Sequence, residues 1–202
     1  MNMSVESDNE RVKEIFRPYN LWCEEFSKEE MRQSKSPDFR VHRDSQMAFF
    51  CEVKSTAEDE WLDRQLTSAP IGSLVGGVRQ DPIYNRIESK IHQAVQQFDA
   101  VNPAQAHPNV LVFVNHDSHA DRYDLESVLT GSIPLQGGRR LRGFRKYSHG
   151  RIRDDKFRIH LYLWLDEVLR GKSFVFNEGT PAHYTSLVDL FSVKSEDVRL
   201  LG

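Results

Sequence analysis

The sequence of 202 residues is poor in cysteine, in long hydrophobic runs and in net charge. Two cysteines, Cys23 and Cys51, are too few for a disulfide framework or a zinc cluster, so we expect a protein of the reducing cytoplasm. No apolar run is longer than the five residues from Val110 to Val114, which argues against a transmembrane helix and a membrane partner. The net charge of -3 excludes a uniformly basic nucleic-acid binder but leaves room for local patches.

The size and composition are those of one globular domain. Hydrophobic residues make up 39% of the chain and aromatic residues 10%, enough to form a packed core without disulfides or a structural metal. We therefore expect a single domain over residues 1–202. The charge is unevenly spread, because residues 1–60 carry a net charge of -5 and residues 139–158 carry +7. This separation suggests a site with one acidic and one basic face.

Helices and strands are predicted to alternate along the chain, in an order typical of an α/β fold with a mixed sheet. Residues Asn9–Ser34 have a helical composition, interrupted at Pro18, which removes a backbone hydrogen-bond donor. Two strands are expected next, at Asp38–Arg43 and Gln46–Ser55. From Pro82 to Val101 apolar residues recur at helical spacing and predict a long helix.

The second half continues this alternation. Asn109–Asn115 is an apolar run of strand length, which predicts a central strand covered on both faces. Asp121–Leu129 is expected to form a helix that ends at Gly131. From Phe157 to Leu165 apolar residues alternate, which predicts a further strand with these residues on one face.

Three charged side chains stand where they can meet across a hairpin. Asp38 begins the first strand of the pair, whereas Glu52 and Lys54 lie two residues apart near the end of the second and so share a face. A turn at Asp44 and Ser45 would pair the strands and bring Asp38 beside Glu52 and Lys54. The sequence therefore predicts two carboxylates and an ammonium at the rim of a sheet.

This set suits hydrolysis of a phosphodiester. Mg²⁺ binds carboxylate oxygens together with water and substrate phosphate, so Asp38 and Glu52 are predicted to hold Mg²⁺ (or Mn²⁺ as a substitute), with the Val53 carbonyl as a further candidate ligand. Lys54 can orient or deprotonate the attacking water and stabilise charge on phosphorus. The alternative is a solvated ion pair of Glu52 and Lys54, worth less than about 1 kcal/mol. Their place at the end of the apolar run Ala48–Cys51 favours the functional interpretation.

The segment resembles the PD-(D/E)XK nuclease superfamily, whose motif is Pro-Asp, a hairpin, and then an acidic residue, any residue and lysine. Here Pro37-Asp38 and Glu52-Val53-Lys54 are separated by thirteen residues. The resemblance implies a restriction-endonuclease-like core of a helix, a three-stranded meander, a second helix and a fourth strand, over about residues 9–117, with an α/β extension over about 118–202. It also implies Mg²⁺-dependent hydrolysis of phosphodiester bonds, in DNA rather than RNA. One strand of the meander has no obvious segment, because Ala57–Leu66 is too polar.

Members of this superfamily often add an acidic residue from the first helix and a glutamine or lysine from the second. For the first role the resemblance implies Glu14, with Glu10, Glu24 and Glu25 as alternatives. For the second role it implies Gln97, which shares a helix face with Lys90 and lies close to Gln93. The alternative for these helix residues is the solvent face of an amphipathic helix.

Basic residues gather in a glycine-rich segment of the second half, which also contains Phe144 and Tyr147. Arginines bind phosphates and aromatic rings stack on bases, so this segment is a candidate nucleic-acid contact. The candidate residues are Arg139, Arg140, Arg142, Arg145, Lys146, Arg151 and Arg153. The alternative is a solvated loop that neutralises the acidic face of the same protein.

Two other functions compete with the nuclease prediction. One is a catalytically inactive nucleic-acid-binding or protein-interaction member of the same fold, and the other is an unrelated α/β domain in which the motif is accidental. A homodimer would suit a nuclease that cuts both strands. His116, Asp117 and His119 follow the apolar strand, but with no distant third partner they are expected to form a polar loop.

Overall fold

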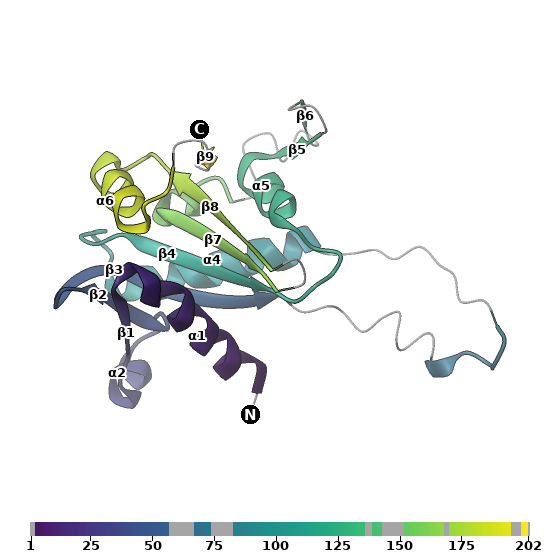
Figure 1. Ribbon diagram of the computed structural model, residues 1–202, viewed down its shortest axis with the longest axis horizontal. Coiled ribbons are helices and arrows are strands. Elements are labelled where there is room, and N and C mark those ends of the chain that lie inside the picture. The colour runs from purple at the N-terminus through teal and green to yellow at the C-terminus, as the bar shows by residue number, and fades with distance from the viewer. Residues whose placement is uncertain are drawn as a thin grey trace.

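The computed structural model describes residues 3–56, 67–73, 83–135, 139–142, 152–167, 170–194 and 199–201. Its centre is a seven-stranded sheet in the order β1-β2-β3-β4-β7-β8-β9 (Figure 1). The strands are β1 (Leu21–Glu25), β2 (Phe39–Arg43), β3 (Gln46–Thr56), β4 (Asn109–Asn115), β7 (Leu161–Asp166), β8 (Gly171–Asn177) and β9 (Arg199–Leu201). A separate hairpin pairs β5 (Ser132–Pro134) with β6 (Arg140–Arg142).

The sheet is mixed, so the expectation of an α/β fold is confirmed. Strands β3, β4 and β7 are parallel neighbours in the middle of the sheet. On one side β1, β2 and β3 form an antiparallel meander, and on the other β8 runs antiparallel to β7 and parallel to β9. The β3–β4 register places Lys54 beside Phe113 of the central strand.

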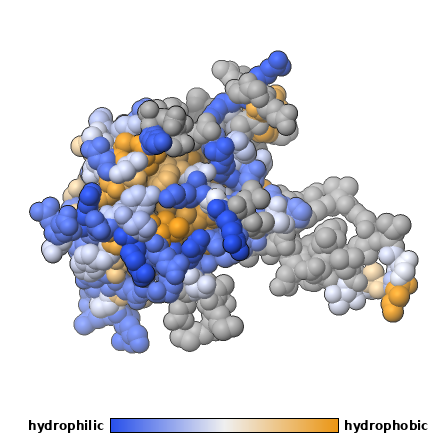
Figure 2. Space-filling model, viewed as in Figure 1, coloured by the Kyte–Doolittle hydropathy of each residue, from blue (hydrophilic) through white to orange (hydrophobic). Residues whose placement is uncertain are grey.

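Helices cover both faces of the sheet and make three layers. The helices are α1 (Met3–Phe16), α2 (Lys28–Gln33), α4 (Ile83–Val101), α5 (Arg122–Thr130) and α6 (Pro181–Phe191), with 3₁₀ turns η1 (Arg17–Tyr19) and η4 (Asp155–Arg158). One hydrophobic cluster joins α4 and α5 to one face of the sheet, and a second joins α1 and α6 to the other. On the face that carries α1 and α6, hydrophobic residues gather between these two helices (Figure 2).

Several sequence predictions are confirmed. Strand β4 covers Asn109–Asn115 and every residue of it is buried, as a central strand between two helical layers requires. Helix α4 buries the predicted apolar residues along one side. Helix α5 begins after Asp121, whose side chain caps it, and ends at Gly131, which adopts the left-handed conformation that favours glycine.

The predicted hairpin between β2 and β3 is also present. Its turn is at Asp44 and Ser45, both with positive φ, as two-residue hairpin turns require. The strands pair antiparallel, with Phe39 opposite Cys51. This register brings the start of β2 to the second half of β3.

The helical prediction over Asn9–Ser34 is wrong in its middle. The helix ends near Pro18 as expected. Asn20 then adopts a left-handed backbone conformation, and Leu21–Glu25 pairs with β2 as strand β1. Strand pairing and burial of Leu21 override a composition that favours a helix. This strand supplies the third member of the meander, ahead of the other two in the chain.

The predicted strand from Phe157 begins later, at Leu161. Phe157 lies in η4 and is 47% exposed, while Ile159 and Leu161 join opposite hydrophobic clusters. The expected shared face is confirmed for Leu161, Leu163 and Leu165, which join one cluster, and wrong for Phe157 and Ile159, which precede the strand. The other side of β7 is buried as well, because the strand lies between helical layers. None of the helices in the described part of the chain has the length and apolar character of a membrane span.

His160 directly precedes strand β7 and is fully buried, and its Nδ1 accepts a hydrogen bond from the backbone amide of Asn109 at 2.9 Å. Its ring packs edge-on against His183, with 4.6 Å between ring centroids. Burial, and after it the charges of His183 and Arg158, lower the pKa of His160 from 6.5 to about 4.

We expect this histidine to make the fold sensitive to acid. Between pH 6.5 and 4 the unfolded chain binds a proton that the folded chain excludes, so the free energy of unfolding falls as the pH is lowered through this window, by at most about 3 kcal/mol from this group. Urea titrations of wild type and His160→Asn from pH 7 to 4 measure the effect. The variant should lose less stability over this range, and an equal loss in both proteins would contradict the lowered pKa of His160.

Candidate active site

Asp38 and Glu52 meet where the start of β2 pairs with the second half of β3, as the predicted hairpin requires. The Asp38 amide donates to Glu52 Oε2 at 3.0 Å, and Asp38 Oδ2 accepts from the Val53 amide at 2.7 Å. Each carboxylate therefore accepts a hydrogen bond from the backbone of the other strand. These reciprocal bonds hold the two side chains together without a ligand.

Lys54 completes the group and is held by two side chains. Its Nζ lies 2.5 Å from Glu52 Oε1 and donates to Gln97 Oε1 at 3.1 Å. Gln97, on α4, in turn donates from Nε2 to the Ser36 carbonyl at 3.0 Å. The structure thus brings together Asp38, Glu52, Lys54 and Gln97, four of the residues that the sequence singled out.

The Glu52–Lys54 pair is not a solvated surface ion pair. The Glu52 side chain is 2% exposed and that of Lys54 is 17% exposed. Burial is the main cause that raises the pKa of Glu52 to about 8, and the charge of Asp38 raises it further, while Lys54 lowers it. Burial also raises the pKa of Asp38, against the effect of the Val53 amide. An isolated protein at neutral pH therefore holds fewer than two negative charges here.

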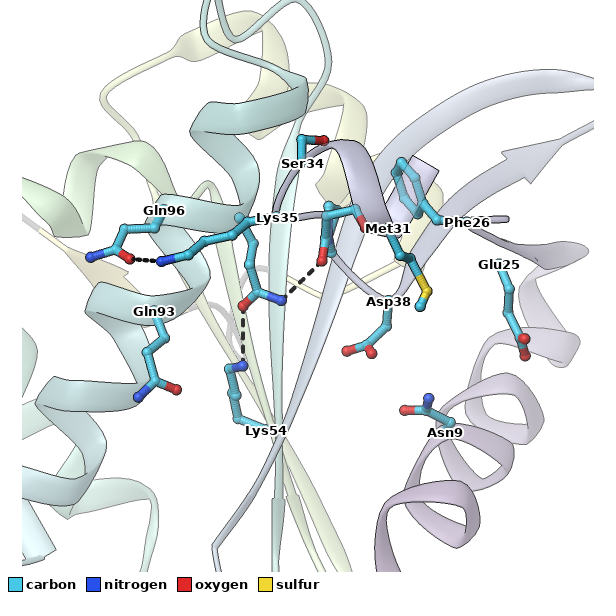
Figure 3. Close-up of a pocket in the computed structure, with 13 residues that line it drawn as sticks. Asn9, Glu25, Phe26, Met31, Ser34, Lys35, Asp38, Lys54, Gln93 and Gln96 are labelled. Atoms are coloured by element: carbon cyan, nitrogen blue, oxygen red, sulfur yellow. Dashed lines mark hydrogen bonds between the residues drawn. The ribbon is translucent and has the colours of Figure 1, made fainter. Parts of the chain in front are cut away.

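A pocket of about 540 Å³ opens above this group (Figure 3). Asp38 and Lys54 lie on its floor, and α4 forms one wall with three glutamines. The opposite wall is α2 and the segment that follows it. The lining residues are Asn9, Glu25, Phe26, Met31, Ser34, Lys35, Ser36, Pro37, Asp38, Lys54, Gln93, Gln96 and Gln97.

The first helix contributes Asn9, which sequence reasoning missed. A hydrogen bond with Asn9 lowers the pKa of Asp38, so the amide faces that carboxyl (Figure 3). The side-chain oxygen of Asn9 is buried and has no hydrogen-bond partner within the described residues. A search for acidic residues could not find it, because asparagine carries no charge.

The glutamates considered for the first helix lie elsewhere. Glu14 is 60% exposed in its side chain and pairs with Arg11 at 3.4 Å, so the structure does not bring it to the carboxylates. Glu10 and Glu25 both contact Lys13 at 2.8 Å, although Glu25 also lines the pocket. Glu24 contacts His42 at 2.9 Å.

Comparison of the chain with models of known protein families, with curated proteins and with solved structures finds no match. The function therefore has to be inferred from the geometry of the pocket itself.

The second-helix candidates fall on the pocket side of α4. Gln93 and Gln97 line the pocket. Lys90 is partly buried, and burial together with the charges of Lys54 and Arg86 lowers its pKa. The ammonium of Lys90 is therefore close enough to that of Lys54 to be affected by its charge.

Where the structure describes the basic segment, some of its residues make internal contacts and others are exposed. Arg140 lies 3.5 Å from Glu126, and Arg158 Nε donates to Asp99 at 2.9 Å. Lys156 is buried and donates to the Leu129 carbonyl. Arg139 and Arg153 are exposed. Arg145, Lys146, Arg151 and the side chain of Arg142 lie outside the described residues, and none of the described residues of this segment lines the pocket.

The polar residues after β4 form a loop, as expected. His116 contacts Asp8 at 2.8 Å, and Asp117 is buried against Arg86 at 2.7 Å. The described part of the chain contains no group of three or more histidine, cysteine or acidic side chains placed to hold a metal ion. A cation at Asp38 and Glu52 would therefore depend on backbone, amide, water or substrate oxygens for its other ligands.

Proposed function

We propose that this chain is a metal-dependent nuclease that hydrolyses phosphodiester bonds, in DNA, with a restriction-endonuclease-like core. The observation that carries the proposal is the buried carboxylate of Glu52 in contact with Asp38 and Lys54, both of which line a pocket. The order of elements supports it as well: helix α1, the meander β1-β2-β3, helix α4 and strand β4 follow one another along the chain.

The residues present fit a divalent cation such as Mg²⁺ or Mn²⁺. Asp38 and Glu52 offer carboxylate oxygens, and the raised pKa of each reflects negative charge that burial leaves poorly compensated. Asn9 offers a buried oxygen that has no hydrogen-bond partner among the described residues. The Val53 carbonyl is a further candidate. Hard oxygen donors of this kind are those that Mg²⁺ prefers.

Lys54 is the residue that acts on the nucleophile in this mechanism. Bound at the carboxylates, Mg²⁺ would polarise the phosphodiester and lower the pKa of a coordinated water. The Lys54 ammonium stands beside the carboxylates and can orient the attacking water and stabilise charge as it develops on phosphorus. Gln97 fixes the ammonium from the other side, so Lys54 keeps its position before substrate arrives.

Metal binding and cleavage test this function together. We expect calorimetry with Mg²⁺ or Mn²⁺ to show binding to wild type, weakened at least about tenfold in Asp38→Asn, because a neutral amide is a poorer ligand than a carboxylate. In the same samples, the wild-type protein should cut DNA and the Asp38→Asn variant should not. Asp44→Asn is the matched control, since Asp44 lies in the hairpin turn with its side chain 88% exposed.

A wild-type protein that binds no divalent cation and cuts no nucleic acid would overturn the proposal. The binding or interaction module of the same fold would then be the better interpretation. In that case the role of Asp38 and Glu52 would be structural, because their reciprocal hydrogen bonds hold β2 to β3 whether or not a reaction takes place.

A further inference from the structure

Asp38 and Lys54 line a walled pocket, and Glu52 is buried beside them. One wall is α4, and the other is a strap formed by residues 34–37 after α2. Two hydrogen bonds tie the strap to the helix: Lys35 Nζ donates to Gln96 Oε1 at 2.7 Å, and Gln97 Nε2 donates to the Ser36 carbonyl at 3.0 Å (Figure 3). The pocket is thus closed along one side above Lys54.

This enclosure discriminates between forms of nucleic acid. A duplex is a stiff rod whose paired and stacked nucleotides cannot turn individually, so we expect the strap and the α4 wall to hinder its approach to Asp38. A single strand has nucleotides that rotate independently and can enter one at a time. The volume of about 540 Å³ lies within the range of pockets that hold small molecules, which includes a nucleotide.

The pocket walls carry groups that suit one nucleotide. Gln93 and Gln96 present amides that both donate and accept hydrogen bonds, as the edges of an unpaired base require. Met31 lines the pocket and is 55% exposed, which gives an apolar surface for the face of a base. Lys35 adds a cation at the strap, within reach of a phosphate.

A second, independent feature lies on the face of β1 and β2 next to the pocket. Trp22 is 50% exposed and its ring stacks on His42, at 4.3 Å between centroids and 14° between planes. Two residues before His42, Arg40 lies 3.8 Å over the ring of Phe26, which lines the pocket. An exposed aromatic ring therefore lies four residues along the chain from Phe26, which lines the pocket. Proteins that stack the bases of a single strand use such rings.

We propose that the substrate is single-stranded nucleic acid, with one nucleotide in the pocket and a base farther along the same strand stacked on Trp22. This inference rests on the proposed nuclease function and names its substrate form. Two glutamates lie beside this path: Glu24 contacts His42, and Glu30 contacts Arg40. The charge of Glu30 is thereby partly neutralised along the path of the strand.

The test compares one labelled oligonucleotide, single-stranded and annealed to its complement, in the presence of Mg²⁺ or Mn²⁺. We expect the single strand to be cut about a hundredfold faster, because a paired nucleotide must first be unpaired and unstacked. Equal cutting of both forms would overturn this inference and leave the nuclease function standing. If neither form is cut, the nuclease function fails. Fluorescence anisotropy on the same samples then measures whether the protein binds the single strand more tightly than the duplex. Equal binding of both forms would overturn the inference too.

Substitutions at Trp22 test the stacking position separately. Trp22→Ala should weaken binding of the single strand about tenfold, whereas Trp22→Phe should keep most of it because the ring remains. We expect the loss to appear in KM and in binding, with kcat nearly unchanged, since Trp22 lies outside the catalytic group. Circular dichroism checks the folding of both variants. Unchanged binding by a folded Trp22→Ala, or equal loss in Trp22→Phe, would overturn the placement of the strand on this face.

Discussion

Replacing Lys54 by alanine is expected to lower kcat about a hundred- to a thousandfold while the chain stays folded and still binds Mg²⁺. Lys54 contacts Glu52 and Gln97 and is not among the proposed metal ligands, so its loss removes stabilisation of the reacting phosphate without removing a ligand. Single-turnover cleavage, metal calorimetry and circular dichroism on the same preparation measure the three quantities. Lys172→Ala, at a lysine on β8 that bonds Tyr19, is the matched control.

Loss of metal binding in a folded Lys54→Ala would contradict this role and make the lysine a structural partner of Glu52. Lys54→Arg separates the two tasks proposed for the ammonium. Arginine keeps the positive charge but does not give up its proton, so activity retained in Lys54→Arg points to electrostatic stabilisation. Activity lost in both variants points to proton transfer or to exact placement of the ammonium.

The substitution Glu52→Gln is expected to abolish cleavage and the stabilising effect of Mg²⁺. The variant protein should nevertheless become more stable relative to wild type as the pH rises. The pKa of Glu52 is raised from 4.5 to about 8 in the folded protein. The folded chain therefore binds a proton that the unfolded chain releases, and this contribution to stability is present in full below pH 4.5 and lost as the pH rises through 8. Glutamine resembles the protonated carboxyl and does not titrate.

Urea titrations from pH 5 to 9, without divalent cations, measure this difference. The free energy of unfolding of the variant should be close to that of wild type at pH 5 and higher than that of wild type at pH 9. Added Mg²⁺ should raise the free energy of unfolding of wild type only. Glu29→Gln, at an exposed glutamate on α2, should follow wild type throughout. A constant difference between Glu52→Gln and wild type across the range would contradict the raised pKa of Glu52.

The part of the site that sequence reasoning could predict lies within one hairpin. Asp38, Glu52 and Lys54 are placed by the alternation of side chains along two strands and by a turn at Asp44 and Ser45. All of these are local properties. Gln97 came from helix periodicity and from the resemblance, and the structure places it against Lys54.

The remainder depends on contacts between distant segments, which local patterns do not encode. Leu21–Glu25 becomes a strand because β2 offers it a partner, and its composition alone did not indicate this. A useful local signal was nevertheless present: Ser27 and Glu30 form a capping box, which marks the start of a new helix and so the end of what precedes it. Asn9 reaches the pocket through the packing of α1 on the sheet, which no spacing in the first helix specifies.

The reciprocal hydrogen bonds between the two carboxylates and the backbone have a consequence for how this chain can change over generations. Because Asp38 and Glu52 fasten β2 to β3, a descendant that stopped cleaving would still lose a hydrogen bond between the strands if either were replaced by a residue that cannot accept one. Selection for folding alone would retain a hydrogen-bond acceptor at both positions. Lys54 and Gln97 join no strand to its neighbour, so their joint retention in a lineage is the better sign that cleavage itself is under selection.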